Sequence, residues 1–337
     1  MEKNIPYFLN EMLIKQYGEK LAKQIVNGYS KDRPVTLRVN TLKSNVQDIK
    51  KIFNDLGYKV QEVNWNENAL IIENIKENEI KKLDIYNDGY IYLQSLSSMM
   101  PVITLDPKQE ENILDMAAAP GGKTTQIAMN TMNQAFITAC EKNKIRAERL
   151  KYNIEKQGAK RITVLTQDAR ELDDYFSFDK ILLDAPCSGS GTINLNDERL
   201  EKIFTKELVS RSVKTQFELL KKAITLLKPG HEMVYSTCSI LKEENEENIL
   251  KILKSGKAEL VSINKENFKD IPQLPVSLDG TICVCPNDLY EGFFIARIRR
   301  KWHITFNLLN IRRLVWQTTK SLKLQIELVL YFLYCIF

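Results

Sequence analysis

The chain has 337 residues, 44% of them hydrophobic, which is enough for two domains or for one large domain with an extension. Its six cysteines are scattered and do not suggest a disulfide framework, and its two histidines are too few for a His-based triad or a His-rich metal site. The first residues lack the charged, apolar and small-residue order of a signal peptide, so we expect a cytoplasmic protein.

Residues 1–92 predict a small helical and α+β region. Apolar residues recur at helical spacing along the first part of the chain, and "VTLRVNT" (35–41) alternates as a strand does. "NVQDIKKIFNDLG" (45–57) is an amphipathic helix, and "YKVQEV" and "ALIIEN" follow as two strands. Basic residues of this region, among them Arg38 and Lys43, are candidate contacts for the phosphates of a nucleic acid.

Residues 93–300 predict an α/β domain. Candidate strands, in chain order, are "NILDM", "AFITAC", "RITVLT", "DKILLD", "EMVYST" and "GFFIARIRR". Helical stretches lie between them, including the basic "KIRAERLKYNIEKQG", in which Arg146, Arg149 and Lys151 are further candidate phosphate contacts. This alternation predicts a mainly parallel sheet covered on both faces, with ligands at the carboxyl ends of the strands.

Residues 301–337 do not continue the pattern. Their apolar stretch "LQIELVLYFLYCIF" is short for a membrane span and is interrupted by Glu327. We expect no membrane association and treat this segment as a basic and apolar extension without an assigned role.

The stretch "ILDMAAAPGGKTTQIA" predicts a strand, a loop of small residues and the start of a helix. The loop is similar to a phosphate-binding loop, so a nucleotide hydrolase that uses Lys123, Thr124 and Asp184 is one hypothesis. Pro120, however, removes a backbone N–H from the middle of such a cradle. The loop still allows close approach of a ligand at a helix N-terminus, and it does not by itself choose between cofactors.

Three acids follow consecutive predicted strands: Glu141, Asp168 and Asp184. Glu141 lies about twenty residues after the glycines, where an acid suits the hydroxyl pair of a ribose. Three carboxylates at one sheet edge favour a nucleoside pocket, and they would repel a triphosphate unless several metal ions were present.

Two cysteines follow neighbouring strands. Cys187 lies in "LLDAPCSGSGT" and Cys238 in "MVYSTCSI", and these polar loops suit a reactive thiolate better than a core cysteine. Cys283 and Cys285 fit an alternating strand, Cys140 ends an apolar strand, and we expect all three to serve packing. A lone C-x-C pair is a weak metal signal, so we expect no metal site.

A nucleoside cofactor beside two thiols suits one reaction in particular. Carbon 5 of cytosine becomes nucleophilic when a thiolate adds to carbon 6, and it can then attack the methylsulfonium of S-adenosylmethionine. One cysteine can form the adduct while the other assists its release, and Asp184 can act on the ring nitrogen edge. The residues alone do not say which cysteine has which role.

The sequence resembles the Rsm/Nop/Sun-type (RsmB/NOP family) RNA cytosine-5 methyltransferases. The resemblance covers roughly residues 1–300 and is carried by "LRVNTLK", "YLQSLSSMMP", "ILDMAAAPGGKTTQ", "LLDAPCSGSGT", "MVYSTCSILKEENEE" and "YEGFFIARIRR". One departure is Ala117, where the family often has Cys, but that position is a loop element.

The resemblance implies a class I methyltransferase fold, Rossmann-like with a mainly parallel seven-stranded sheet, preceded by a small α+β region that binds RNA. It implies Cys238 as nucleophile and Cys187 as the release residue, with Asp184 also in the catalytic set. The cofactor-binding residues that it implies are Ala117, Ala118, Ala119, Pro120, Gly121, Gly122, Lys123, Glu141, Asp168 and Asp184.

RNA rather than DNA as the substrate follows from the resemblance, and ribosomal and transfer RNA both remain open. The target base must be unstacked before a thiol can reach carbon 6, which favours loops and opened stems. Two alternatives remain: the phosphate-loop hydrolase, which leaves both cysteines unexplained, and a non-catalytic RNA-binding or ribosome-assembly factor.

Overall fold

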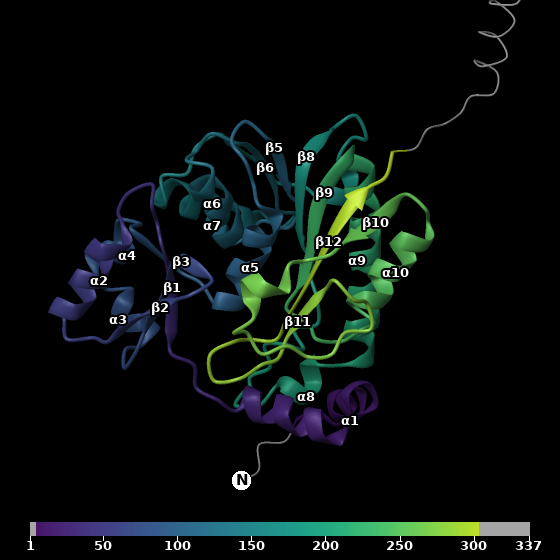
Figure 1. The fold of residues 1–337 in the computed structure, drawn as a ribbon, viewed down its shortest axis with the longest axis horizontal. Coiled ribbons are helices and arrows are strands. Elements are labelled where there is room, and N and C mark those ends of the chain that lie inside the picture. Colours follow the sequence, from purple (N-terminus) through teal and green to yellow (C-terminus); the bar gives the residue numbers. More distant parts are fainter. Residues whose placement is uncertain (1–4, 303–337) are drawn as a thin grey trace, which may run out of the picture. The chain divides into compact units, whose positions relative to one another are not determined.

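A computed structural model describes residues 5–302 of the chain, and Figure 1 shows its elements in sequence colours. The first of them is a long helix, α1 (Tyr7–Tyr29), whose buried residues include Leu9, Leu13 and Ile25. Gly18 has a φ of +77° and a non-helical conformation, so the helix is kinked there. The kink is possible because glycine has no Cβ to clash in the left-handed half of φ/ψ space.

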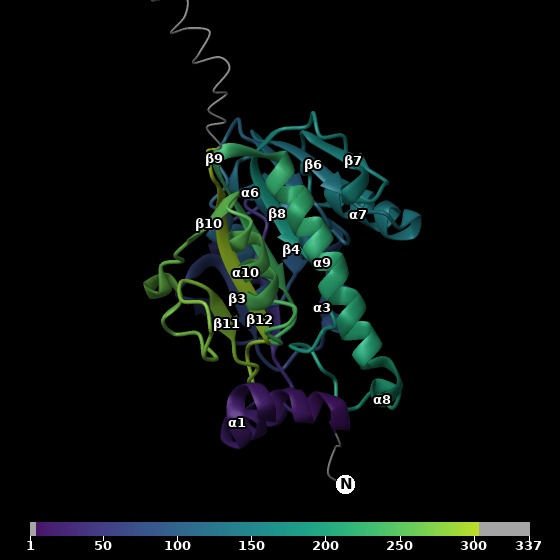
Figure 2. The same ribbon diagram turned by 90° about the vertical axis from the view of Figure 1, so that its right-hand side faces the viewer.

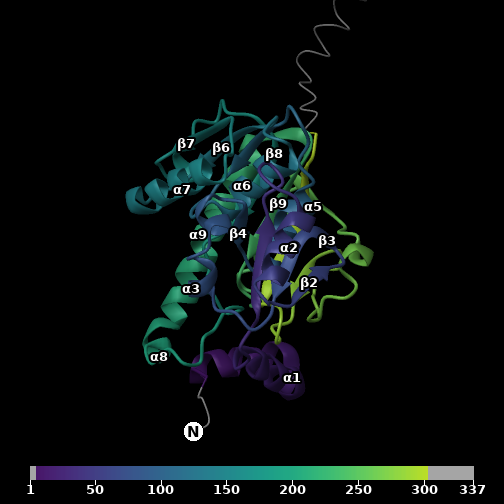
Figure 3. The same cartoon turned by 90° about the vertical axis from the view of Figure 1, so that its left-hand side faces the viewer.

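A four-stranded antiparallel sheet follows, in the order β2-β3-β1-β4. Its strands are β1 (Val35–Val39), β2 (Val60–Val63), β3 (Asn66–Ile72) and β4 (Ile91–Leu93). Helix α2 (Val46–Asp55) buries Ile49 and Phe53 in a core that it shares with this sheet. Figure 3 faces this sheet and α2, and the two short helices α3 (Glu77–Ile80) and α4 (Asp84–Asn87) belong to the same region.

The predictions for this region are largely confirmed. Helix α2 and strands β1 to β3 lie where the sequence placed them, although β3 begins three residues before "ALIIEN". The sequence did not predict β4, α3 or α4, because elements of three or four residues are too short to display a period.

The larger sheet has eight strands. Seven follow the order β10-β12-β9-β8-β5-β6-β7, and the eighth, β11, pairs with β12. The bounds are β5 (Asn112–Asp115), β6 (Phe136–Cys140), β7 (Ile162–Leu165), β8 (Phe178–Asp184), β9 (Leu227–Thr237), β10 (Ala258–Val261), β11 (Ile282–Val284) and β12 (Phe293–Arg300). Strands β5 to β9 are parallel to one another, whereas β12 pairs antiparallel with β9, β10 and β11. The expected mainly parallel seven-stranded sheet is confirmed.

Helices cover both faces of this sheet. They are α5 (Leu96–Leu105), α6 (Gly122–Asn130), α7 (Lys144–Lys156), α9 (Lys206–Leu226) and α10 (Glu246–Lys254). The short helix α8 (Leu200–Ile203) buries no residue, and single turns occur at η1 (Ala169–Glu171) and η2 (Lys265–Phe268). Figure 2 looks onto the face covered by α9 and α10.

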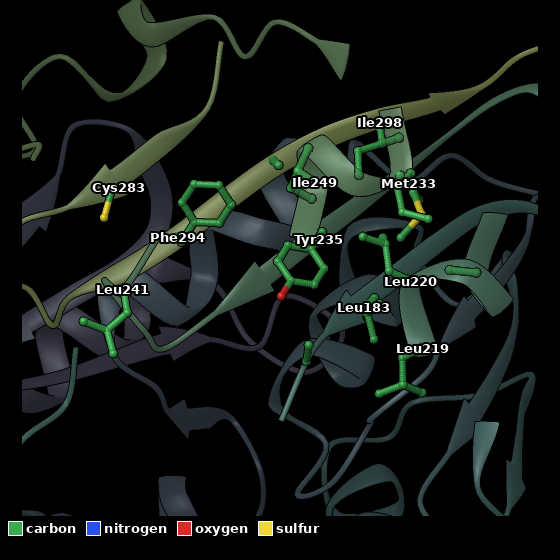
Figure 4. Packing of buried hydrophobic residues seen from close by; sticks show 14 of the residues in the cluster. Leu183, Leu219, Leu220, Met233, Tyr235, Leu241, Ile249, Cys283, Phe294 and Ile298 are labelled. Atoms are coloured by element: carbon green, nitrogen blue, oxygen red, sulfur yellow. The ribbon is translucent and has the colours of Figure 1, made fainter. Parts of the chain in front are cut away.

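Successive side chains of the central strands point to opposite faces of the sheet, so they pack in different hydrophobic cores. Leu183 and Tyr235 pack with side chains of α9, α10 and α1, whereas Leu182 and Val234 pack with side chains of α5 and α6. Figure 4 shows the first of these cores, where Leu183 and Tyr235 lie near Leu220 of α9.

The described residues up to Lys301 form one compact unit. Residues 303–337, which make up nearly all of the predicted C-terminal extension, lie outside the described residues. No helix in the described part of the chain is long and apolar enough to cross a membrane.

Candidate active site

The glycine-containing loop connects β5 to α6 at the carboxyl edge of the large sheet. Gly121 precedes the helix with a φ of +110°, a conformation that a side chain would strain. At Gly122, an added Cβ would lie 3.1 Å from the ring of Tyr92, so a larger residue there would crowd this ring. These two glycines fix the path of the loop against β4.

The loop lines a cavity of about 260 Å³. Most of the residues predicted to hold the cofactor line it together: Ala117, Ala118, Ala119, Pro120, Gly122, Lys123 and Asp184. The remaining walls come from β4, from the start of α5, from the two residues between them and from Asp115. Three larger hollows, of about 480, 720 and 1130 Å³, contain none of the predicted site residues.

Lys123 connects the loop to β8. Its Nζ donates to Asp184 Oδ2 at 2.6 Å and to Ser98 Oγ at 2.8 Å, and both members of the Lys123–Asp184 ion pair are largely buried. Asp184 Oδ1 accepts a hydrogen bond from Ser236 of β9 at 2.7 Å. Each oxygen of Asp184 therefore has a partner, and the charge of Lys123 is already balanced by a carboxylate.

Acids stand at four adjacent strand ends, in the order β8, β5, β6, β7. Three of them, Asp184, Glu141 and Asp168, are those that the sequence predicted. Glu141 is buried, accepts from the backbone N–H of Asn143 at 2.9 Å and pairs with Arg146. Asp168 binds Arg170, whose hydrogen bonds hold the pKa of that carboxyl below its usual value. Neither Glu141 nor Asp168 lines the cavity at the loop.

The fourth acid, Asp115, was not predicted from the sequence. It ends β5, is 1% exposed and accepts a hydrogen bond from Thr124 Oγ1 at 2.7 Å. Burial raises the pKa of this carboxyl to about 6. The sequence could have indicated this residue, because the Asp of "ILDM" ends the predicted strand directly before the loop, as the other three acids end or follow theirs.

The two cysteines that the sequence singled out are in contact. Cys187 follows β8 and Cys238 follows β9, and the structure pairs the ends of these parallel strands, Asp184 beside Ser236. The Sγ atoms of Cys187 and Cys238 lie 2.9 Å apart, and both cysteines are free. The thiols do not line the loop cavity; they lie beyond Asp184 along the same sheet edge.

The pKa of the Cys187 thiol lies well above its ordinary value. The hydrogen bond with Cys238 and desolvation are the main causes, and electrostatic repulsion from Cys238 and Glu244 adds to them. Cys187 is therefore protonated at neutral pH and is able to donate its S–H to Cys238.

The other described cysteines serve packing, as expected. Cys140, Cys283 and Cys285 are buried, and burial raises the pKa of Cys140 to about 12 and that of Cys285 to about 11. Within residues 5–302, no group of three or more His, Cys, Asp or Glu side chains is arranged to hold a metal ion.

One predicted phosphate contact is wrong. Arg38 is 1% exposed, so it cannot bind a phosphate at the surface. It donates to Gln94 Oε1 at 2.6 Å, to the carbonyl of Gly122 at 2.7 Å and to Thr125 Oγ1 at 2.9 Å. The sequence pattern suggests a solvated arginine in a basic region, but this one joins β1 to the first turn of α6.

The other basic candidates are exposed at the surface. Arg149 and Lys151 are exposed on different faces of α7, since they lie two residues apart, and Lys151 pairs with Glu148 at 2.8 Å. Arg146 donates to the carbonyl of Ala119 at 2.9 Å and so braces the loop, and Lys43 donates to the carbonyls of Asp88 and Lys156. Of the four, Arg149 is the best placed for a phosphate.

Comparisons with known proteins agree with this geometry. Residues 102–299 match the family described as 16S rRNA methyltransferase RsmB/F, and residues 5–77 match the RsmF/B-like ferredoxin-like domain. The chain is 38% identical over 277 residues to ribosomal RNA small subunit methyltransferase F of Vibrio vulnificus and 36% identical over 275 residues to that of Vibrio parahaemolyticus. These alignments cover 79% of this chain but 57% and 56% of the relatives, so the chain spans little more than half of their length.

Solved structures show the same fold. PH0851 has a TM-score of 0.79 at 34% identity, with 87% of this chain and 65% of that chain covered. NSun6 from Pyrococcus horikoshii with SFG has a TM-score of 0.78 at 25% identity, with 88% and 98% covered. A methyltransferase homologue from Pyrococcus horikoshii has a TM-score of 0.73 at 31% identity, with 88% and 100% covered. From the family match, the shared fold and the sheet edge that carries the loop and the thiols, we conclude that the chain belongs to the RsmB/F family of methyltransferases.

Proposed function

We propose that this protein transfers a methyl group from S-adenosylmethionine to carbon 5 of a cytosine in RNA through a covalent bond from Cys238 to carbon 6. The observation that carries the proposal is the 2.9 Å contact between Cys187 and Cys238, at the sheet edge that also carries the glycine loop. Membership of the RsmB/F family supports the same reaction.

The residues at the loop suit this cofactor. When bound, S-adenosylmethionine supplies an electrophilic methyl group. The backbone of Ala117–Lys123 at the start of α6 would hold its carboxylate end, and Glu141 would accept hydrogen bonds from its ribose hydroxyls. Asp168 and Asp184 would add negative charge at the same edge, which favours a cationic ligand.

The phosphate-loop hydrolase is less well supported. The only lysine of the loop is paired with Asp184 at 2.6 Å, and Pro120 contributes no N–H to a phosphate cradle. A triphosphate would have to break the ion pair and lie among the strand-end acids, which is unfavourable.

The thiol pair accounts for the proton balance of the reaction. Cys187 donates its S–H to the thiolate of Cys238, which attacks carbon 6 and makes carbon 5 nucleophilic. After methyl transfer, the proton on carbon 5 leaves and the bond from sulfur to carbon 6 breaks. Cys187 gives its proton to the departing sulfur and receives the one from carbon 5, so that one proton is released when Cys238 ionises again.

Asp184 acts at the base. Lys123 and Ser236 hold its two oxygens, and two residues separate it from Cys187. In this position it would accept a hydrogen bond from the nitrogen edge of the cytosine.

We further propose small-subunit ribosomal RNA as the substrate, in preference to transfer RNA, and a cytoplasmic location. Support comes from the family description and from the names of the bacterial relatives. In this proposal the N-terminal region, residues 1–92, contacts the RNA, and residues 93–300 carry catalysis.

Covalent trapping tests the proposal. Wild type, Cys187→Ala and Cys238→Ala are incubated with ribosomal RNA and S-adenosylmethionine and separated on denaturing gels. We expect Cys187→Ala to accumulate a nuclease-sensitive protein–RNA adduct, because the release step is impaired, and Cys238→Ala to form none. An adduct in Cys238→Ala instead would reverse the two roles, and the absence of an adduct in every protein would contradict the thiol mechanism.

A further inference from the structure

Glu244 is a buried carboxylate outside the residues that the reaction has so far required. It lies in the turn between β9 and α10 and is 0% exposed. Buried carboxylates are rare because desolvation of the charge is costly unless partners compensate it. Within residues 5–302 Glu244 forms no ion pair, so its partners are neutral hydrogen-bond donors.

Four donors surround the carboxylate, two at each oxygen. Oε1 accepts from the backbone N–H of Ser188 at 2.8 Å and from Gln216 Nε2 at 2.9 Å. Oε2 accepts from the hydroxyls of Ser188 and Ser239, the latter at 2.6 Å. Three of the four donors therefore belong to the residues directly after Cys187 and Cys238.

Other contacts also tie the two loops together. The backbone N–H of Gly191 donates to the carbonyl of Cys238 at 2.9 Å, the hydroxyls of Ser190 and Ser239 lie 2.8 Å apart, and Ser190 Oγ accepts from the N–H of Ile240 at 2.9 Å. On the Cys187 loop these contacts involve Ser190 and Gly191, whereas Glu244 binds Ser188, the residue directly after Cys187. Its charge also faces Cys187, since it contributes to the raised pKa of that thiol.

We propose that Glu244 is a positioning residue whose carboxylate joins the two thiol loops and sets Cys187 against Cys238. This inference rests on the proposed function for its catalytic consequence. A shorter side chain would not reach both loops, and a displacement of about 1 Å at reacting groups can cost on the order of 100-fold in rate.

The test compares two variants of Glu244 with a matched control. Glu244→Asp keeps the charge but shortens the reach, whereas Glu244→Gln keeps the reach. In Glu244→Gln the amide oxygen can accept from the two N–H donors, and the amide nitrogen can donate to the two serine hydroxyls, which also serve as acceptors. The control, Glu246→Asp, shortens a second buried acid, two residues away, whose side chain is hydrogen-bonded to the backbone of Ser277 and not to the cysteine loops.

Two readouts separate positioning from general stability. The first is kcat and KM for methylation of RNA: we expect Glu244→Asp to lower kcat by on the order of 100-fold with KM unchanged, and Glu244→Gln to restore most of it. The second needs no RNA: diamide oxidises Cys187 and Cys238 to a disulfide, and mass spectrometry of the linked peptides follows its rate. We expect slower linkage in Glu244→Asp than in wild type, Glu244→Gln or Glu246→Asp.

Wild-type kcat and linkage rate in Glu244→Asp would overturn the inference, as would equal losses in Glu244→Asp and Glu246→Asp. If Glu244→Asp does not fold, Ser188→Ala replaces it, because it removes one hydroxyl donor and keeps the backbone donor; an unchanged linkage rate there would overturn the inference. If wild type itself does not methylate RNA, the proposed function fails, while the linkage rates still decide the role of Glu244.

Discussion

At the scale of single residues, the buried charge of Asp115 at the end of β5 lowers the stability of the fold at neutral pH. Its carboxylate is almost completely buried and receives one side-chain hydrogen bond, from Thr124. The pKa of about 6 lies above the ordinary 3.8, so the folded protein binds a proton more readily than the unfolded chain does. The contribution of Asp115 to stability is therefore favourable at low pH and is lost as the pH rises through about 6.

Asp115→Asn should raise the free energy of unfolding at pH 7 by up to about 3 kcal/mol, since one pKa unit corresponds to about 1.4 kcal/mol. The amide still accepts from Thr124 and carries no charge to desolvate. Urea unfolding at pH 4.5 and pH 7 would measure this, with the exposed Asp55→Asn as control. A variant less stable than wild type at pH 7 would show that the charge of Asp115 is compensated in the fold.

At the scale of elements, strand β1 and helix α6 are joined by one side chain. Arg38 leaves β1 and donates to the carbonyl of Gly122, at the start of the helix that follows the cofactor loop. Burial lowers the pKa of its guanidinium to about 10, which leaves it charged at neutral pH. The conformation of the loop therefore depends on the N-terminal sheet as well as on the loop sequence.

Arg38→Lys should lower the free energy of unfolding by about 2 kcal/mol and weaken binding of S-adenosylmethionine. A single ammonium does not reproduce the planar fork that reaches Gln94, Gly122 and Thr125, so buried acceptors lose their partner. Denaturant unfolding and calorimetric titration would measure the two effects. The control is Arg149→Lys on the exposed side of α7, and unchanged cofactor binding in Arg38→Lys would contradict the coupling.

Sequence and structure agree best where a pattern repeats. The strands with alternating or continuous apolar runs were predicted, and so was the convergence of Cys187 and Cys238, because neighbouring parallel strands end at one edge. The burial of Arg38 and Glu244 was not predicted, since it arises from packing between distant segments. Glu244 lies in "LKEENEE", a charge run that by itself suggests a solvated helix face.

At the scale of the whole molecule, the basic side of α7 is the surface that we propose meets the RNA backbone. Arg149 is exposed there, and Tyr152, three residues on and therefore on the same face of the helix, is 61% exposed; Lys151 is exposed on another face of α7. An exposed tyrosine next to cations suits stacking with an unpaired base.

Charge reversal at Arg149 and Lys151 should weaken RNA binding and reduce the slope of log affinity against log salt by about 1 for each phosphate that the variant no longer neutralises. Affinity for S-adenosylmethionine should not change. Filter binding at several salt concentrations would measure the slope, with Lys254→Glu at the end of α10 as the matched control. An unaltered slope would place the RNA path on another face.

Helix α1 holds the loops that carry Cys187 and Cys238 in place. The hydroxyl of Tyr17 donates to the carbonyl of Ile240, two residues after Cys238, and that of Tyr29 donates to the carbonyl of Ser190, three residues after Cys187. Helix α1 thus completes loops that lie more than 150 residues later in the sequence. Deletion of residues 1–92, which we propose contact the RNA, would therefore also remove the hydrogen bonds that hold both cysteine loops.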